Sequence, residues 1–122
     1  MSNNANWFNR LALFLAGVLG AGGVAAAAGA SHAGEDRILG ALSLIGLSHA
    51  AVFVAFGLSS ITAPLLRSGA LIVGIGVCLF SADLSARYFF GQALFPMSAP
   101  FGGGTIIVGW LVIAIAGLAG RR

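Results

Sequence analysis

Few side chains in this 122-residue chain could do chemistry, and they lie far apart in the sequence. They are two histidines, His32 and His49, one cysteine, Cys78, and the pair Asp83 and Arg87, spaced i, i+4. The sequence holds no nucleophile beside a base, no metal-ligand spacing and no glycine-rich phosphate loop. We therefore expect a protein that is not an enzyme, with no catalytic residue, no metal and no cofactor.

His49 is the most central of these residues in its apolar segment. It follows about eleven residues of that segment, or roughly 17 Å at the rise of an α-helix, which is near the middle of a bilayer. An ionisable side chain at that depth is a functional candidate. A neutral imidazole bonded to a nearby hydroxyl or carbonyl is the alternative, and the sequence favours this structural role without excluding the other.

His32 lies at the end of the first apolar segment, beside Glu35 and Asp36. There it could cap the helix terminus or bond to a carboxylate. His32 and His49 are not expected to share a haem, because at helical rise they differ by about 16 Å in depth and axial ligands share one depth. Two copies of His49 across a dimer axis stay geometrically open.

Asp83 and Arg87 are expected near the outer end of a third helix. At i, i+4 spacing they can bond to each other, while the arginine extends toward the interface. Asp83 is also expected within reach of His32 or Arg37. A path for protons or ions would need further polar groups in the inner half, where the sequence offers only Ser and Thr.

The elements that position these residues follow from composition. Hydrophobic residues make up 59% of the chain and charged residues 7%, with a mean hydropathy of +1.03, against about 25% charged residues in soluble domains. Uncharged runs cover residues 11–34, 38–66, 68–82 and 88–120, and a membrane-spanning helix needs about 20 apolar residues. We predict an all-α polytopic membrane protein. It is an antiparallel bundle of four transmembrane helices over residues 8–30, 38–60, 65–90 and 101–120, forming one domain over 1–122.

The sequence also allows predictions about the first and the last of these helices. Pro96 and Pro100 are expected to precede the last helix. A secretory signal peptide cleaved after the small residues around Ala33 is the less favoured alternative for the first segment, which is longer than the ~7 to 15 apolar residues of a signal core.

The first segment is rich in small residues spaced by four. In lipid, helices associate through close backbone approach, which small side chains permit. We expect this helix at the centre of the bundle, touching at least two others. The alternative is that its smooth face meets another protein, a lipid or a quinone. The expected helix-packing residues are Gly17, Ala21, Gly22, Ala25, Ala26, Gly29 and, in the last helix, Gly109.

The charges indicate an orientation and exclude one class of partner. The net charge is +3 and the pI about 10.6, but the basic residues are all arginines scattered along the chain, so no basic face suits nucleic acid. Both termini are expected to be cytoplasmic. This rests on Arg10, Arg67, Arg121 and Arg122 against Arg37 and Arg87. Trp7 and Tyr88 are candidate interface anchors, and Trp110 is expected to pack within the bundle.

Five short motifs occur in a fixed order. They are Gly29-Ala30-Ser31-His32-Ala33, Ser48-His49-Ala50, Leu79-Phe80-Ser81-Ala82-Asp83-Leu84, Pro100-Phe101-Gly102-Gly103 and Gly109-Trp110. This ordered set resembles the domain-of-unknown-function 423 family of small membrane proteins, related to the transmembrane protein 256 group, over nearly the whole chain. Ser31 and Ala82 depart from the family pattern but remain small. The resemblance implies a four-helix inner-membrane protein without an assigned activity.

Three functions remain open. The favoured one is a bacterial inner-membrane protein that packs as a non-catalytic structural or accessory subunit against membrane-protein partners or its own copies. The second is a small dimeric channel or transporter. The third is a lipid- or quinone-binding protein using the small-residue faces and the aromatic residues Phe89, Phe90, Phe95 and Phe101.

Overall fold

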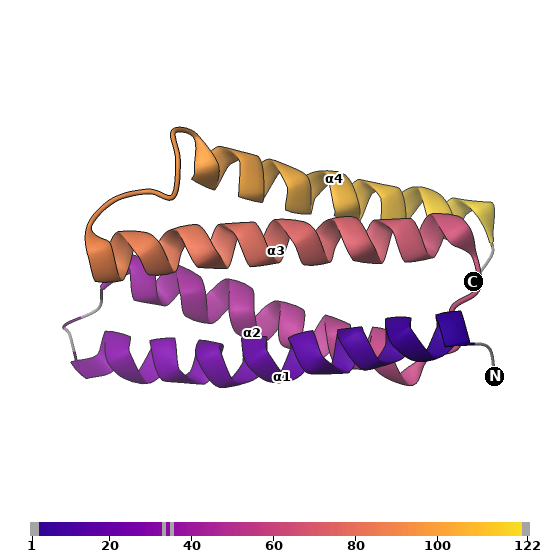
Figure 1. Ribbon diagram of the computed structural model, residues 1–122, viewed down its shortest axis with the longest axis horizontal. Coiled ribbons are helices and arrows are strands. Elements are labelled where there is room, and N and C mark those ends of the chain that lie inside the picture. Colours follow the sequence, from indigo (N-terminus) through magenta and orange to yellow (C-terminus); the bar gives the residue numbers. More distant parts are fainter. Residues whose placement is uncertain (1–2, 33, 35, 121–122) are drawn as a thin grey trace.

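The computed structural model describes residues 3–32, 34 and 36–120. They form four helices, α1 (Asn3–His32), α2 (Arg37–Leu58), α3 (Pro64–Phe90) and α4 (Ser98–Ala119), and each runs antiparallel to the one before it (Figure 1). All four are long and apolar enough to cross a membrane. The predicted all-α, antiparallel four-helix transmembrane bundle is therefore confirmed.

Local chemistry sets the helix limits. The Asp36 carboxylate caps α2 by accepting hydrogen bonds from the backbone N–H groups of Ile38 at 2.8 Å and Leu39 at 3.1 Å. Gly91 ends α3 with a φ of 75°, a left-handed conformation that glycine adopts without strain.

The start of α4 differs from expectation. Pro100 lies inside the first turn, because α4 begins at Ser98. The first N–H groups of a helix have no intrahelical partner, so the N–H that proline lacks removes no bond there.

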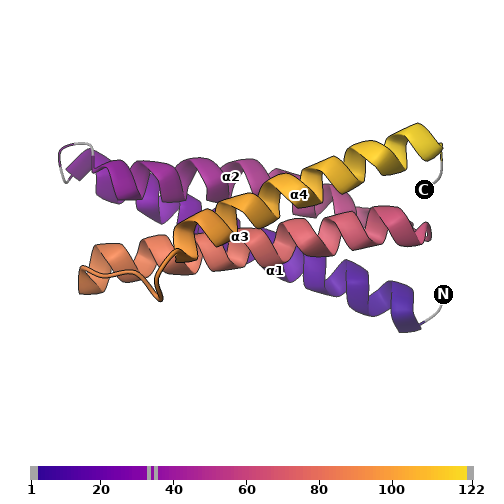
Figure 2. The same cartoon turned by 90° about the horizontal axis from the view of Figure 1, so that it is seen from above.

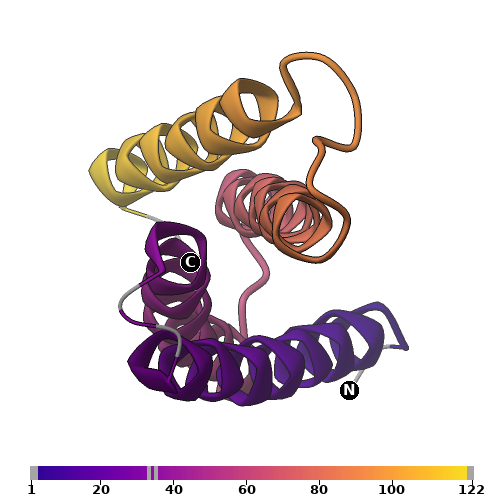
Figure 3. The ribbon, with the colours of Figure 1, turned by 90° about the vertical axis from the view of Figure 1, so that its left-hand side faces the viewer.

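The helices form two pairs. α1 packs along α2 and α3 along α4, and a smaller α2–α3 contact joins the pairs, as the end-on view shows (Figure 3). The first residues of α1 and the last residues of α4 lie at the same end of the bundle (Figure 2). The expectation of a central α1 is wrong, since its extensive backbone contact is with α2 alone. The expected contact with a second helix is made through side chains, because buried residues of α1 and α3 belong to one core.

Glycines explain which helices approach most closely. A Cβ on Gly109 would lie 2.5 Å from Cγ2 of Val73 and 2.7 Å from its backbone nitrogen, so only a glycine lets α4 meet α3 there. One face of α3 repeats this contact, because a Cβ on Gly76 would lie 2.7 Å from the backbone nitrogen of Ile106. Between α1 and α2 the tight positions include Gly23, where a Cβ would lie 2.8 Å from Leu47 Cγ, and Gly57, where a Cβ would lie 2.5 Å from Leu13 Cγ.

All four helices contribute to one apolar core near the middle of the bundle. Val73 and Val77 of α3 are 0% exposed and lie at its centre. The surrounding buried side chains are Ala12, Ala16, Leu19, Phe53 and Ile106. This core fixes the positions of the few polar side chains around it.

Candidate functional site

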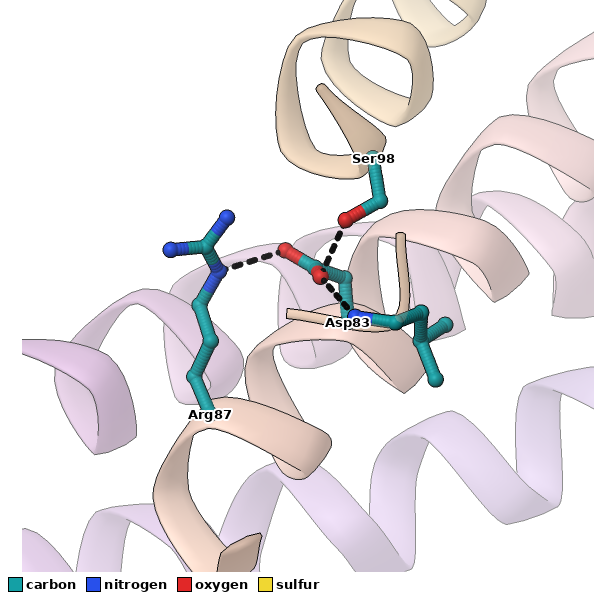
Figure 4. A network of polar contacts seen from close by, with 4 residues as sticks. Asp83, Arg87 and Ser98 are labelled. Carbon is teal, nitrogen blue, oxygen red and sulfur yellow. Dashed lines mark hydrogen bonds and ion pairs between the residues drawn. The ribbon is translucent and has the colours of Figure 1, made fainter. Parts of the chain in front are cut away.

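The carboxylate of Asp83 is the most buried charged group of the described chain, at 0% exposure. Its Oδ2 accepts a hydrogen bond from Nε of Arg87 at 2.8 Å, one turn further along α3. Its Oδ1 accepts two more, from the backbone N–H of Leu94 at 3.1 Å and from the hydroxyl of Ser98 (Figure 4). Both oxygens are thus bonded, as a buried carboxylate requires.

Three parts of the chain meet at Asp83. The α3–α4 loop turns back over the end of α3, and Met97, with a φ of 69°, directs the chain into α4 so that Ser98 faces the carboxylate. The i, i+4 bond to Arg87 is as the sequence indicates. Asp83 bonds to neither His32 nor Arg37; the other groups that donate to it are the backbone of Leu94 and the hydroxyl of Ser98. No sequence signal identified these two residues.

This geometry makes Asp83 an anchor for the α3–α4 connection. The Arg87 side chain is 39% exposed, and it reaches the carboxylate through its Nε (Figure 4). Three donors from the protein engage both oxygens of this carboxylate, which ties the end of α3 to the loop and to the start of α4.

His49 forms the second polar cluster and is 7% exposed. Its Nδ1 lies 2.9 Å from the carbonyl oxygen of Ile45 and 3.1 Å from Oγ of Ser48. Its Nε2 accepts a hydrogen bond from the indole N–H of Trp110 at 3.2 Å. Because Trp110 can only donate, Nε2 must carry a lone pair and the proton sits on Nδ1, where the carbonyl accepts it.

The His49 arrangement joins α2 to α4 across the bundle. The ring is neutral, and the nitrogen that would bind a haem iron or a metal is already occupied by Trp110. The geometry supports the structural role for His49, and it places Trp110 in a bundle contact, with 38% of that residue exposed.

His32 is remote from both clusters. It is the last residue of α1 and is exposed. Glu35, one of its expected carboxylate partners, lies outside the described residues. The other, Asp36, caps α2 instead. Across residues 3–32, 34 and 36–120, no three His, Cys, Asp or Glu side chains are grouped so that they could hold a metal ion.

The α1–α3 side of the bundle is hollowed by two grooves. The terminal-side groove, of about 400 Å³, lies between the halves of α1 and α3 nearest the chain termini, with Phe53 of α2 also in its lining. The loop-side groove, of about 410 Å³, lies toward the α1–α2 loop. Its lining includes Gly22, Ala25, Ala26, Gly29, Ser81, Ser85, Tyr88 and Phe89.

The small residues of α1 thus face the loop-side groove or the surface more than another helix. A Cβ on Gly22 would have no other residue's atom within 4 Å, while Ala26 is buried at 7% exposure. Gly17 and Ala21 are exposed on the outer surface of α1. The residues at the closest backbone approach of α1 and α2 are Gly23 and Gly46, which sequence reasoning did not select.

One polar atom in the loop-side groove is unsatisfied. The hydroxyl oxygen of Ser81 is buried and has no hydrogen-bond partner among the described residues. In a membrane, such a hydroxyl is suited to a bond across to a neighbouring helix.

Comparisons with known proteins add no relative: no family model, curated protein or solved structure matches this chain. The resemblance to the domain-of-unknown-function 423 family therefore stays a prediction from its motifs.

Proposed function

We propose that this chain is a non-catalytic accessory subunit of the bacterial inner membrane, and that its loop-side groove receives a transmembrane helix of a partner protein. The observation that carries the proposal is the pairing of small residues with an unpartnered hydroxyl. Gly22 leaves open space in the wall of the groove, and Ser81, whose buried hydroxyl has no partner among the described residues, belongs to its lining. Close backbone approach and interhelical hydrogen bonds are the two interactions that hold helices together in lipid.

The outer face of α1 extends this surface. Gly17, Ala21 and Ala25 are exposed and spaced by four, so they form one smooth row beside the groove. A partner helix resting on that row could approach the α1 backbone without displacing a large side chain.

The polar clusters support a non-catalytic role. Asp83 and His49 are the two ionisable groups buried at membrane depth in the described chain, and every polar atom of both is bonded internally. A proton carrier or ion ligand needs an atom that can exchange partners. A channel or transporter, the competing function, would have to break these bonds.

The proposal includes an orientation and a family. Both termini are placed in the cytoplasm, supported by the arginine bias of the sequence. Membership of the domain-of-unknown-function 423 family is proposed on the ordered motifs of the sequence, and some of these motifs meet in space. A Cβ on Gly102 would lie 2.9 Å from Cα of Phe80, and His49 bonds to Trp110.

Affinity purification from native membranes in mild detergent tests the accessory role. The leucine side chain of Gly22→Leu should enter the groove, where a Cβ has open space. The bundle should therefore keep its thermal stability, while binding of the partner helix is lost. Overpacking an interface costs about 1–3 kcal/mol, so we expect recovery of the partner to fall by about fivefold or more. Gly117→Leu, the same change at an exposed position of α4 with open space around its Cβ, is the matched control.

Three results would overturn the proposal. One is a partner recovered equally with Gly22→Leu and with the control. Another is recovery of the chain alone, or only of a second, differently tagged copy of it. The third is proton or ion flux through liposomes containing the purified protein, which would favour the channel or transporter.

A further inference from the structure

The two helical hairpins meet mainly along one line of contact. α1 packs along α2 and α3 along α4, whereas backbone contact between the hairpins is concentrated between α2 and α3, in the middle of the end-on view (Figure 3). α1 lies on one side of this line, beside α3, and α4 lies on the other side, beside α2. If each hairpin rotates as a unit about the α2–α3 contact, bringing α1 onto α3 carries α2 away from α4.

The two sides of this line differ in how they are held. The α1–α3 side contains both grooves, of about 400 and 410 Å³. On the α2–α4 side, the indole N–H of Trp110 donates to Nε2 of His49 at 3.2 Å. Since His49 and Trp110 belong to different hairpins, a rotation that closes the grooves would pull the two side chains apart. This hydrogen bond therefore opposes closure of the α1–α3 side.

Other contacts favour closure at the loop-side groove. Small residues line both of its walls, with Gly22 and Gly29 on α1 and Ser81 and Ser85 on α3. A Cβ on Gly22 would meet open space, and the hydroxyl of Ser81 has no hydrogen-bond partner among the described residues. Small residues and hydroxyl groups are what helices use to associate in lipid. Movement of α1 onto α3 would bring these walls together, so α1 can take the place of a partner helix.

We propose that α1 competes with the partner helix for the α3 wall of the loop-side groove, and that the His49–Trp110 bond keeps this wall available by holding α2 beside α4. This role rests on the proposed function, because the partner helix occupies the same groove. His49 and Trp110 are positioning residues, since neither lines the groove. Breaking their bond shifts the bundle toward a closed form that excludes the partner.

Distances between spin labels on α1 and α3, measured by double electron–electron resonance on the purified chain in nanodiscs, test for closure. The labels are attached at Ala28→Cys and Ala82→Cys, two exposed positions outside the groove lining, and Cys78→Ser removes the native thiol. Trp110→Phe removes the indole donor and keeps an aromatic ring. One hydrogen bond changes a two-state equilibrium by about fivefold, so Trp110→Phe should raise the population at short distance by about that factor.

Variants on both helices separate the hydrogen bond from general effects on packing. Leu111→Ala, a change at the exposed neighbour of Trp110, should leave the distances of the parent unchanged. His49→Leu removes the acceptor from α2, and it answers the same question if Trp110→Phe does not fold. The double variant should match either single variant, because all three lack the same bond. Equal distances in the two single variants and the control, or additive shifts in the double variant, would overturn the proposal.

Gly22→Leu distinguishes closure of the groove from docking of the partner. Its side chain should hold α1 away from α3, so adding Trp110→Phe should no longer shorten the distance, and continued shortening would refute closure at this groove. In purification from native membranes, Trp110→Phe alone should lower recovery of the partner by about fivefold. Unchanged distances in Trp110→Phe, with the partner lost in Gly22→Leu, would refute the competition by α1 and leave the docking site intact. Shortened distances in Trp110→Phe, with the partner retained in Gly22→Leu, would refute the docking site instead.

Discussion

Replacing Asp83 by alanine tests the anchoring of the α3–α4 connection. The substitution removes the acceptor of three hydrogen bonds and leaves the hydroxyl of Ser98, at 0% exposure, without its partner. Hydrogen bonds to a charged group contribute about 1.5–3 kcal/mol each, and loss of one member of a buried pair costs about 3–5 kcal/mol. The bond to Arg87 should contribute at the low end of the range for a hydrogen bond to a charged group, because that side chain is 39% exposed.

We therefore expect Asp83→Ala to lower the free energy of unfolding by about 3–5 kcal/mol, a large share of the ~5–15 kcal/mol typical of a folded protein. Unfolding by dodecyl sulfate in mixed micelles, followed by circular dichroism, measures this difference. A double-mutant cycle with Arg87→Ala isolates the pair, and we expect a coupling energy of about 1 kcal/mol.

Ser81→Ala is the matched control. Ser81 lies on the same helix as Asp83, and its buried hydroxyl has no hydrogen-bond partner among the described residues. It should change stability by no more than about 0.5 kcal/mol. The reasoning is refuted if Asp83→Ala stays within about 1 kcal/mol of the wild type, or if Ser81→Ala is equally damaging.

Further substitutions test three other contacts. Gly109→Ala should separate α3 from α4 and cost about 1–3 kcal/mol, whereas Gly117→Ala, with open space around its Cβ, should stabilise α4 by up to about 1 kcal/mol in the same unfolding assay. Trp110→Phe removes the indole donor to Nε2 of His49 and should cost about 1–3 kcal/mol, and unchanged stability together with an unchanged histidine ¹⁵N spectrum would contradict the assigned bond. Asp36→Ala should cost about 0.5–2 kcal/mol through loss of the α2 cap, and Asp36→Asn should restore most of it.

The two polar clusters show which contacts can be predicted from the sequence and which cannot. The bond from Arg87 to Asp83 follows from i, i+4 spacing on one helix, so local geometry predicts it. Ser98 is 15 residues from Asp83 and reaches it only because the intervening loop folds back. Trp110 and His49 are 61 residues apart on different helices, and periodicity within either helix carries no information about their pairing.

The small residues of α1 likewise show what local spacing predicts and what only the tertiary structure decides. Their spacing indicates a smooth helix face, but it does not say which neighbour the face meets. The closest contacts instead formed at Gly23 and Gly46 of the first hairpin and at Gly109 of the second, where backbones cross. Gly22, one position before Gly23, lines a groove because α1 diverges from α3 there.

The sequence by itself determined the number of helices, their approximate limits and their membrane character, because a bilayer requires long uncharged segments whose backbone groups bond internally. Only the tertiary structure decided how the two hairpins cross, which polar groups are satisfied across helices and where the bundle stays open. Those outcomes depend on the rotation and crossing of whole helices, which small side chains permit in several ways and which are settled by all the contacts together.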